Sequence, residues 1–199
     1  MEFGGVSVNE LEFIPREGDL AYGYIPGNEK IVFIKAGLGG EYLGYENKYL
    51  RIARLLHEKH GCTVISVSNP NDKRFGVADD RVILEEMLRK FGFENPELYL
   101  FGNSDGCRKG LALAAEIPFR RMILVNMPLT INFHHTKKNL SLIPETDVIA
   151  VYGEKDVSYP YAVFLEGKGK RVKVIRVPDA DHNFAGKTEE FIGLAEMLL

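Results

Sequence analysis

The stretch Gly102-Asn103-Ser104-Asp105-Gly106 decides the fold, because it joins two segments of different hydrophobic pattern. The apolar run Leu98 to Phe101 before it is typical of a buried strand, and the segment Cys107 to Glu116 after it is typical of a helix. Glycines on both sides of Ser104 allow a sharp turn and a close approach of the helix to its neighbours. In this strand–turn–helix context a serine is exposed at the tip of the turn, beside helix N-terminal amides. The stretch therefore predicts a nucleophilic serine at the end of a strand.

Length and composition are those of an ordinary globular protein. The 199 residues are 45% hydrophobic and 27% charged, which predicts one domain, residues 1–199, around a buried core. The formal net charge of -3 gives no broad attraction to nucleic acid or anionic membranes, so neither is expected as a partner. The N-terminus lacks a secretory pattern, and no apolar run approaches the roughly 18–20 residues that span a bilayer. We therefore expect a cytoplasmic protein.

The two cysteines, Cys62 and Cys107, are too few for a disulfide framework or a metal-binding set. Each lies in a segment with an apolar pattern, so we expect both to be small buried hydrophobic residues. This cysteine usage suits a reducing compartment.

Strand patterns alternate with helix patterns along the chain. Strands are expected at residues 6–14, 20–25, 31–34, 62–67, 98–101, 121–126, 147–152 and 172–177. Helices are expected at residues 49–56, 82–88 and 107–116, and from 188 to the C-terminus. The first two strands should form an antiparallel edge hairpin, and the alternation that follows predicts an α/β fold with a mainly parallel sheet covered on both faces.

Residues with chemical potential follow several of these strands directly. Gly37, Ser104, Asp156 and His182 each come just after a predicted strand, and ligands of such sheets gather outside the carboxyl ends of the strands. A serine hydroxyl needs an adjacent base, and histidine is the usual one because it exchanges a proton near neutral pH. A carboxylate then fixes the imidazole tautomer. We expect Ser104, His182 and Asp156 to fill these three roles.

Other side chains compete for the role of the acid. Asp156 itself ends an ordinary turn sequence, and Glu154 is a rival in the same turn. Asp179 and Asp181 lie too close to His182 along the chain to be favoured partners, although Asp181 can hold the loop by capping. Asn126, after an earlier strand, is not an acid.

The remaining histidines have less distinctive contexts. His57 and His60 lie on or just after the first predicted helix and are expected at the surface. His134 and His135 lie in the connection 128–144 without nearby Asp, Glu or Cys, so they do not form a metal-ligand set. They are candidates to line the mouth of a pocket.

The chain resembles the α/β-hydrolases from about residue 31 to its C-terminus. Gly102 to Gly106 matches the nucleophile elbow, Gly153 to Asp156 the acid turn, and Asp181 to Phe184 the histidine loop. Their order, Ser then Asp then His, is that of the same family. The resemblance implies the α/β-hydrolase fold and a small, esterase-like serine hydrolase in which Ser104, Asp156 and His182 are catalytic, with no metal or organic cofactor.

The resemblance also implies an oxyanion hole made of two backbone N–H groups. One belongs to Asp105, and the other comes from the loop after the first central strand, where we choose Leu38. Many relatives carry His-Gly in that loop, whereas this chain has Ala36-Gly37, which leaves the loop geometry open. The Asp105 carboxylate would repel an oxyanion if it turned inward, so we expect it to point elsewhere.

The segment available for a cap, residues 129–145, is too short for a separate domain. We therefore expect an open pocket shaped by this segment and by the loop 69–77, with Gly37, His134 and His135 among its lining residues. Four cations near these segments can favour an anionic substrate, although a solvated surface explains them as well. They are Lys73, Arg74, Lys137 and Lys138.

The expected activity is hydrolysis of a small carboxylic ester or thioester through an acyl-enzyme, with a small molecule as the partner and amide cleavage as a further chemistry. Three matters stay open. The fold can serve a catalytically weak binding or interaction protein, the same residues can transfer an acyl group to an acceptor other than water, and the chain can form a homodimer.

Overall fold

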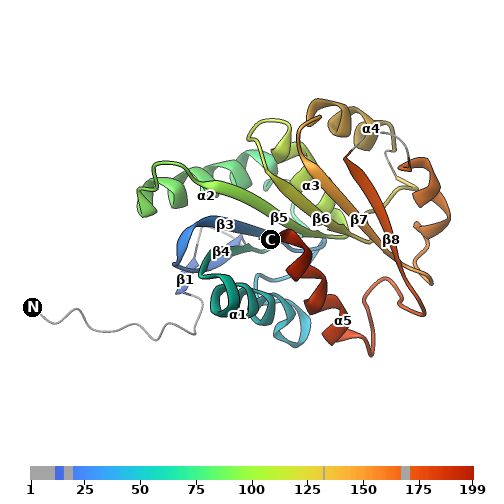
Figure 1. Cartoon of the computed structure of the whole chain (residues 1–199), viewed down its shortest axis with the longest axis horizontal. Coiled ribbons are helices and arrows are strands. Elements are labelled where there is room, and N and C mark those ends of the chain that lie inside the picture. The colour runs from blue at the N-terminus through green and yellow to red at the C-terminus, as the bar shows by residue number, and fades with distance from the viewer. Residues whose placement is uncertain (1–11, 16–19, 132, 167–170) are drawn as a thin grey trace, which may run out of the picture.

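The computed structural model describes residues 12–15, 20–131, 133–166 and 171–199, in which strands alternate with helices (Figure 1). The strands are β1 (Glu12–Pro15), β2 (Ala21–Ile25), β3 (Asn28–Lys35), β4 (Cys62–Val67), β5 (Glu97–Asn103), β6 (Arg121–Val125), β7 (Asp147–Gly153) and β8 (Val172–Val177). The α-helices are α1 (Lys48–His60), α2 (Val77–Phe91), α3 (Asp105–Ala114), α4 (Phe133–Leu142) and α5 (Thr188–Gly193). Short 3-10 helices are η1 (Tyr45–Asn47), η2 (Tyr159–Phe164) and η3 (Leu194–Leu198).

Within the described residues the eight strands form one sheet in the order β1-β2-β4-β3-β5-β6-β7-β8. The neighbours β4, β3, β5, β6, β7 and β8 pair in parallel, whereas β2 is antiparallel to both β1 and β4. The predicted antiparallel edge pair and the mainly parallel sheet are therefore confirmed. The start of the first predicted strand, residues 6–11, and the turn residues 16–19 lie outside the described structure. Because the central strands are parallel, the residues that follow them meet at one edge of the sheet.

Side chains of the central strands alternate between two hydrophobic cores, one on each face of the sheet. Leu100 and Phe101 are consecutive in β5, yet Leu100 lies in the core under α2 and α3 and Phe101 in the core under α1 and α5 (Figure 1). Burial on both faces explains why these strands have continuous apolar sequences. The two free cysteines, Cys107 and Cys62, are buried in the first and the second core, as predicted.

The predicted elements agree with the observed ones at most places, and the exact bounds of β4 and β8 match the expected ranges 62–67 and 172–177. The closing helix is present from Thr188, but its second half tightens into η3. Helix α4 was not predicted. Phe133 and Leu140 anchor it to the core under α2 and α3, whereas much of its remaining surface is polar, so its apolar stripe is weak in the sequence.

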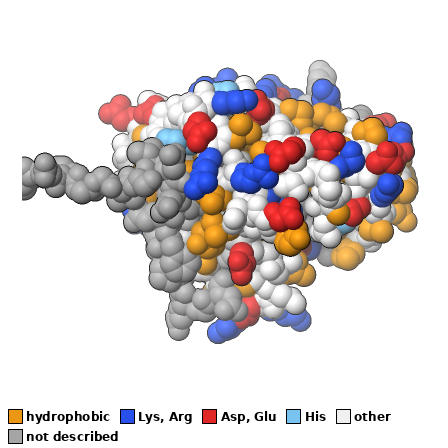
Figure 2. All heavy atoms as spheres, turned by 90° about the horizontal axis from the view of Figure 1, so that it is seen from below, with side chains coloured by type: hydrophobic (Ala, Val, Ile, Leu, Met, Phe, Trp, Pro, Cys, Tyr) orange, Lys and Arg blue, Asp and Glu red, His pale blue; other side chains and the backbone are white. Residues whose placement is uncertain are grey.

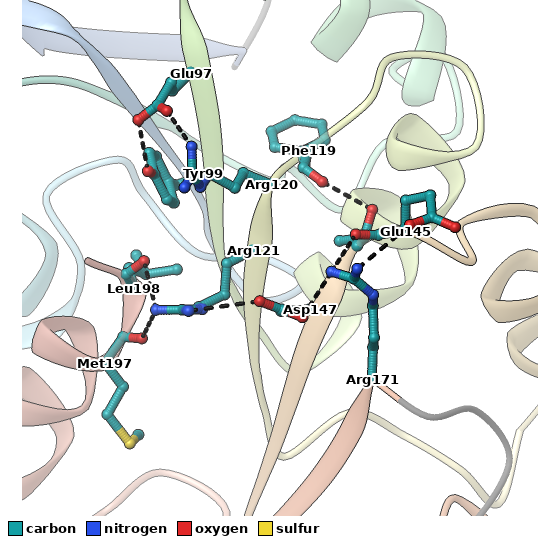
Figure 3. Close-up of polar contacts among 11 residues, drawn as sticks. Glu97, Tyr99, Phe119, Arg120, Arg121, Glu145, Asp147, Arg171, Met197 and Leu198 are labelled. Carbon is teal, nitrogen blue, oxygen red and sulfur yellow. Dashed lines mark hydrogen bonds and ion pairs between the residues drawn. The ribbon is translucent and has the colours of Figure 1, made fainter.

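A polar network ties the C-terminal segment to the amino ends of the strands (Figure 3). Arg121, which begins β6, donates to the backbone oxygens of Met197 and Leu198 at 3.2 and 3.3 Å. It also pairs with Asp147, which begins β7, and Asp147 in turn pairs with Arg171 just before β8. These contacts brace the edge of the sheet opposite to the carboxyl ends of the strands.

Acidic and basic side chains are interspersed on the face that carries α1 and α5, seen from below in Figure 2. The ion pairs Arg51–Glu189 and Lys59–Glu196 connect α1 with α5 and η3 across this face. In the part of the chain that the structure describes, we find no helix with the length and apolar character needed to cross a membrane.

Candidate active site

Ser104 occupies the turn between β5 and α3 with a backbone φ of 51° and ψ of -124°. A positive φ is unusual for a residue with a side chain and persists where the surroundings fix it. The flanking glycines allow this geometry. A Cβ at Gly106 would lie 2.3 Å from the backbone oxygen of Lys35, and a Cβ at Gly102 would lie 3.0 Å from the Cα of Cys107. The Gly-x-Ser-x-Gly pattern therefore has a steric basis in this fold.

The structure brings Ser104, His182 and Asp156 into one hydrogen-bonded chain. His182 Nε2 lies 3.0 Å from Ser104 Oγ, and His182 Nδ1 bonds to Asp156 Oδ2. The Asp156 side chain is fully buried, and its Oδ1 accepts the backbone N–H of Ser158 at 2.7 Å. The His182 side chain is 43% exposed, so the imidazole can be reached from solvent. In this arrangement an imidazole can take a proton from the hydroxyl while the carboxylate fixes its tautomer.

The surroundings of His182 make its imidazole a stronger base. The hydrogen bond that His182 donates to the Asp156 carboxylate raises the pKa of His182 above its ordinary value, although partial burial of the ring opposes this effect. Among more distant charges, Lys48 lowers the pKa of His182 and Asp181 raises it. A higher pKa makes the imidazole a better acceptor for the proton of the serine hydroxyl.

Asn126 connects the two loops that carry Asp156 and His182. Its Oδ1 accepts the backbone N–H of Gly153 at 2.8 Å, and its Nδ2 donates to the backbone oxygens of Asp181 and His182 at 3.1 and 2.9 Å. The residue is fully buried and has a φ of 50°. The sequence indicates only that Asn126 cannot be the acid, and its place directly after a strand is the one signal for a role in the site.

The competing carboxylates have other partners. Glu154 pairs with Arg176, and Asp179 pairs with Lys155 at 3.2 Å. Asp181 accepts the backbone N–H groups two and four residues further on at 3.0 and 2.9 Å, so the predicted capping of the loop is confirmed. Within the described structure, none of these three carboxylates bonds to the His182 ring.

The loop after β3 carries a backbone N–H group without a hydrogen-bond partner in the cleft beside Ser104. The N–H groups of Gly39 and Gly40 in this loop donate to backbone oxygens at 2.7 and 2.8 Å. Over the ranges that the structure describes, the N–H of Leu38 has no such partner. An unpaired donor at this place can receive a ligand oxygen.

Asn69 holds this loop against the start of α3. Its Nδ2 donates to the backbone oxygen of Ala36 at 3.1 Å and to Asp105 Oδ2 at 3.2 Å. The other oxygen of Asp105 bonds to Arg108, so Asn69 and Arg108 hold the Asp105 carboxylate between them. Asn69 is fully buried, and its role had no signal in the sequence because it lies in a loop of ordinary turn residues. The two backbone segments expected to supply oxyanion donors are thus linked by one side chain.

Comparison with known proteins gives no matching family model and no matching curated protein. Solved structures do match over almost the whole chain. An α/β serine hydrolase homologue from Coxiella burnetii superposes with a TM-score of 0.74 at 18% identity, covering 98% of this chain and 100% of that one. The chain has the α/β-hydrolase fold. Two other solved structures share this fold. An esterase domain from Rhodothermus marinus superposes with a TM-score of 0.73 at 13% identity, covering 95% of this chain and 96% of that one. An α/β serine hydrolase without a lid from Xanthomonas campestris superposes with a TM-score of 0.67 at 20% identity, covering 94% of this chain and 93% of that one.

In this α/β-hydrolase fold a cleft of about 270 Å³ opens beside Ser104. One wall is the segment between β3 and α1, which includes Gly37 and Leu38, and the other includes His182. Gly37 comes very close to the elbow, because a Cβ there would lie 3.2 Å from the Cβ of Ser104. The cleft therefore combines the hydrogen-bonded serine with the unpaired N–H of Leu38.

The segment 129–145 does not line this cleft. Helix α4 packs against α3, anchored by Phe133 and Leu140, and its two histidines are exposed. His135 lines a separate cavity of about 250 Å³ between α3 and α4, and His134 lies beside it with the two rings 6.1 Å apart. The expectation that His134 and His135 line the pocket at Ser104 was wrong, because the segment packs against the helical layer and does not fold over the carboxyl edge of the sheet.

The cations singled out in the sequence also lie outside the cleft, as does the loop 69–77. These cations are Lys73, Arg74, Lys137 and Lys138. The cation that lines the cleft is Lys48, which the sequence did not distinguish from other lysines at the start of a helix. Across the described ranges, we find no group of three or more His, Cys, Asp or Glu residues placed to hold a metal ion.

Proposed function

We propose that this protein is a serine hydrolase that cleaves small carboxylic esters or thioesters through an acyl-enzyme. The observation that carries the proposal is the hydrogen-bonded chain from Asp156 through His182 to Ser104, in which His182 Nε2 lies 3.0 Å from the serine oxygen. The serine hydrolase and esterase named among the similar structures support the same activity.

In the first half of the reaction Ser104 Oγ attacks the carbonyl carbon while His182 Nε2 accepts its proton. The electron pair of the C=O bond moves onto the oxygen, and the N–H groups of Leu38 and Asp105 donate to the resulting oxyanion. Collapse of the tetrahedral intermediate expels the alcohol or thiol, which takes the proton from His182. The acyl group is then bound to Ser104.

Water completes the reaction by the same route in reverse. His182 takes a proton from a water molecule, whose oxygen attacks the acyl carbon and forms a second oxyanion. When this intermediate collapses, the acid leaves and the proton returns from His182 to Ser104 Oγ. Asp156 stays ionised throughout, keeps His182 Nδ1 protonated and stabilises the imidazolium.

The size of the cleft favours a small substrate. Its volume of about 270 Å³ is below the range of about 300–1,000 Å³ that drug-sized ligands occupy. No cap covers it in the described structure, since the segment where a cap is often inserted forms α4. We therefore assign substrates of which only a small part occupies this cleft.

Labelling with a fluorophosphonate, followed by mass spectrometry of the adduct, tests the proposal. We expect one adduct on Ser104, lost in Ser104→Ala and in His182→Ala. Ser141→Ala and His134→Ala are matched controls, because both residues are exposed on α4 and should leave labelling unchanged. A folded protein that forms no adduct and cleaves no ester would overturn the proposal and favour a binding protein built on this fold.

A further inference from the structure

A second, larger hollow lies beside the cleft at Ser104. This second hollow, called here the side pocket, has a volume of about 490 Å³ and lies between η1, the start of α1 and the segment 183–191. Tyr45, Lys48 and Asn183 line both hollows, so the two adjoin at these three residues. A substrate with its carbonyl at Ser104 can therefore extend one portion into the side pocket.

The side pocket has an aromatic floor with a cation above it. Phe184 and Phe191 are buried at its base with their ring centroids 5.3 Å apart. The Lys48 Nζ lies 4.3 Å from the centroid of Phe191, and Tyr45 stands at the rim with 80% of its surface exposed. An aromatic face attracts the ammonium but leaves its N–H donors without an acceptor.

Lys48 differs from the other lysines of this region in its partners. Lys59, on the same helix, pairs with Glu196, and Lys187 pairs with Glu190. In the described ranges of the chain, Lys48 forms no ion pair, and its partial burial lowers its pKa. A partly desolvated cation without a counterion costs free energy that an incoming anion can recover.

One carboxylate does line the side pocket. Glu46 has its Oε2 3.2 Å from the Thr188 hydroxyl, which donates to it. Glu46 is exposed, whereas Lys48 is partly buried and also lines the cleft at Ser104. Lys48 and His182 line the same cleft, so an anion held by the ammonium lies close to Ser104.

We propose that Lys48 binds a carboxylate on the substrate, and that the preferred substrates are esters whose acid or alcohol portion carries an anionic group seated in the side pocket. This inference rests on the proposed hydrolase activity and specifies its substrate class. A carboxylate gives the Lys48 ammonium a charge-assisted hydrogen bond, while the apolar part of the same substrate portion covers Phe184 and Phe191. A neutral ester of the same length gains only the apolar contact.

Matched ester pairs test the proposal. The acid-side pair is p-nitrophenyl hexanoate and mono-p-nitrophenyl adipate, and the alcohol-side pair is phenyl butyrate and p-carboxyphenyl butyrate. For at least one pair, we expect Lys48→Met to lower the ratio of kcat/KM for the anionic member to kcat/KM for the neutral member by about tenfold or more, mainly through the KM of the anionic member. The pair that responds identifies which portion carries the anion.

Control variants separate a charge effect from a packing effect. Lys59→Met makes the same substitution on the same helix but away from the pocket, so kcat/KM should stay unchanged for both members of a pair. Lys48→Arg should keep a preference for the anionic ester, and Glu46→Gln should increase it. The proposal would be overturned if Lys48→Met lowered kcat/KM equally for both members of each pair, or did not lower kcat/KM for the anionic member. Either result would count against it even if Ser104 reacts with a fluorophosphonate.

A binding measurement keeps the two proposals distinguishable. In the Ser104→Ala protein, which cannot be acylated at this position, binding of monomethyl adipate and of p-carboxyphenyl butyrate is followed by NMR titration with and without Lys48→Met. We expect at least one of these anionic esters to bind at the side pocket and to lose about tenfold or more in affinity with Lys48→Met. If neither binds there, or if Lys48→Met leaves both affinities unchanged, the anion site is wrong whether or not the serine is a nucleophile.

Discussion

The side-chain amide of Asn126 donates to the backbone oxygen of His182 at 2.9 Å, while its carbonyl oxygen accepts the N–H of Gly153 at 2.8 Å. One buried side chain thus fixes the position of the histidine loop relative to the turn that leads to Asp156. The relationship matters because the imidazole acts only when its two nitrogens meet the hydroxyl and the carboxylate together.

Replacement of Asn126 by glycine should disturb this relationship without a conflict in the backbone, because glycine adopts a positive φ freely. We expect kcat to fall by about tenfold to a hundredfold, and the free energy of unfolding to fall by about 1–3 kcal/mol, since the N–H of Gly153 loses its buried acceptor. Ester hydrolysis and urea denaturation measure the two effects. Asn71→Gly, at an exposed loop position, is the control and should leave both quantities unchanged. A kcat equal to that of the wild type in Asn126→Gly would show that the amide does not position His182.

The pH dependence of kcat/KM should follow the protonation of His182. Only the neutral imidazole accepts the serine proton, so activity should rise with pH through a pKa that Asp156 holds above the ordinary value and should be lost below it. In Asp156→Asn the largest raising effect is removed. The acidic limb should therefore move to lower pH, and kcat should fall by about a thousandfold or more.

Asp181→Asn is the matched control for this profile. It removes a smaller raising effect on the same imidazole and retains an oxygen for capping the loop, so we expect a small shift in the same direction and little change in kcat. An acidic limb that stays in place in Asp156→Asn would disprove the coupling between this carboxylate and His182.

Loss of the Asn69 amide should impair stabilisation of the oxyanion. Asn69→Ala frees both the backbone oxygen of Ala36 and the Asp105 carboxylate, so the segments carrying the Leu38 and Asp105 N–H groups can separate. We expect kcat to fall by about tenfold to a hundredfold with KM nearly unchanged. The affinity for a boronic acid that mimics the tetrahedral intermediate should fall in parallel. A variant that binds the boronic acid as tightly as the wild type would disprove this role.

The close approach of α3 to β3 can be tested with a single methyl group. Gly106→Ala places a Cβ 2.3 Å from the backbone oxygen of Lys35 and 2.4 Å from that of Ala36, and neither atom can move without shifting the strand or the loop. We expect the free energy of unfolding to fall by about 1–3 kcal/mol. Gly193→Ala, in a helix with open space around the added atom, should stabilise the protein by up to about 1 kcal/mol. Urea denaturation of both variants compares them directly; equal stabilities would contradict the steric argument.

A buried ion pair lies behind the same loop. Lys35 Nζ bonds to Asp80 Oδ1 at 2.5 Å and to the backbone oxygen of Ser68 at 2.7 Å, and both charged side chains are almost fully buried. Lys35→Met leaves the Asp80 carboxyl without its partner, so we expect a loss of about 3–5 kcal/mol in the free energy of unfolding. Lys59→Met breaks an exposed pair and should cost about 1 kcal/mol or less. A loss in Lys35→Met no larger than in this control would show that the buried pair is dispensable.

The sequence was sufficient for those features that depend on local pattern. Strands such as β4 are continuous apolar runs because they are buried on both faces, and a buried strand has this signature whatever its neighbours are. Ser104 and Asp156 follow two such strands, β5 and β7, and His182 comes after the edge strand β8. Parallel pairing brings the ends of these three strands to one edge. Their proximity therefore follows from topology.

Features that depend on tertiary approach had no comparable signal. The amides of Asn126 and Asn69 act through backbone groups far away in the chain, and an asparagine after a strand is otherwise an ordinary turn residue. In the sequence, Lys48 resembles any lysine at the start of a helix, because its place beside the segment 183–191 is visible only in the folded structure. His134 and His135 illustrate the opposite error, since two adjacent histidines stand out in the sequence although α4 carries them away from the cleft.

The residues that hold Ser104, Asp156 and His182 in place belong to other segments than the residues at the rim of the side pocket, and this separation affects how the protein can acquire new substrates. Ser104, Asp156 and His182 follow strands of the sheet, and the buried Asn126 amide holds the loops that carry the last two. The side pocket, by contrast, is lined by Tyr45 and Lys48 from a surface segment. Selectivity and reactivity can therefore vary independently. In the proposed hydrolase, substitutions at these surface positions would change the ester preference and leave Ser104, Asp156 and His182 unaltered.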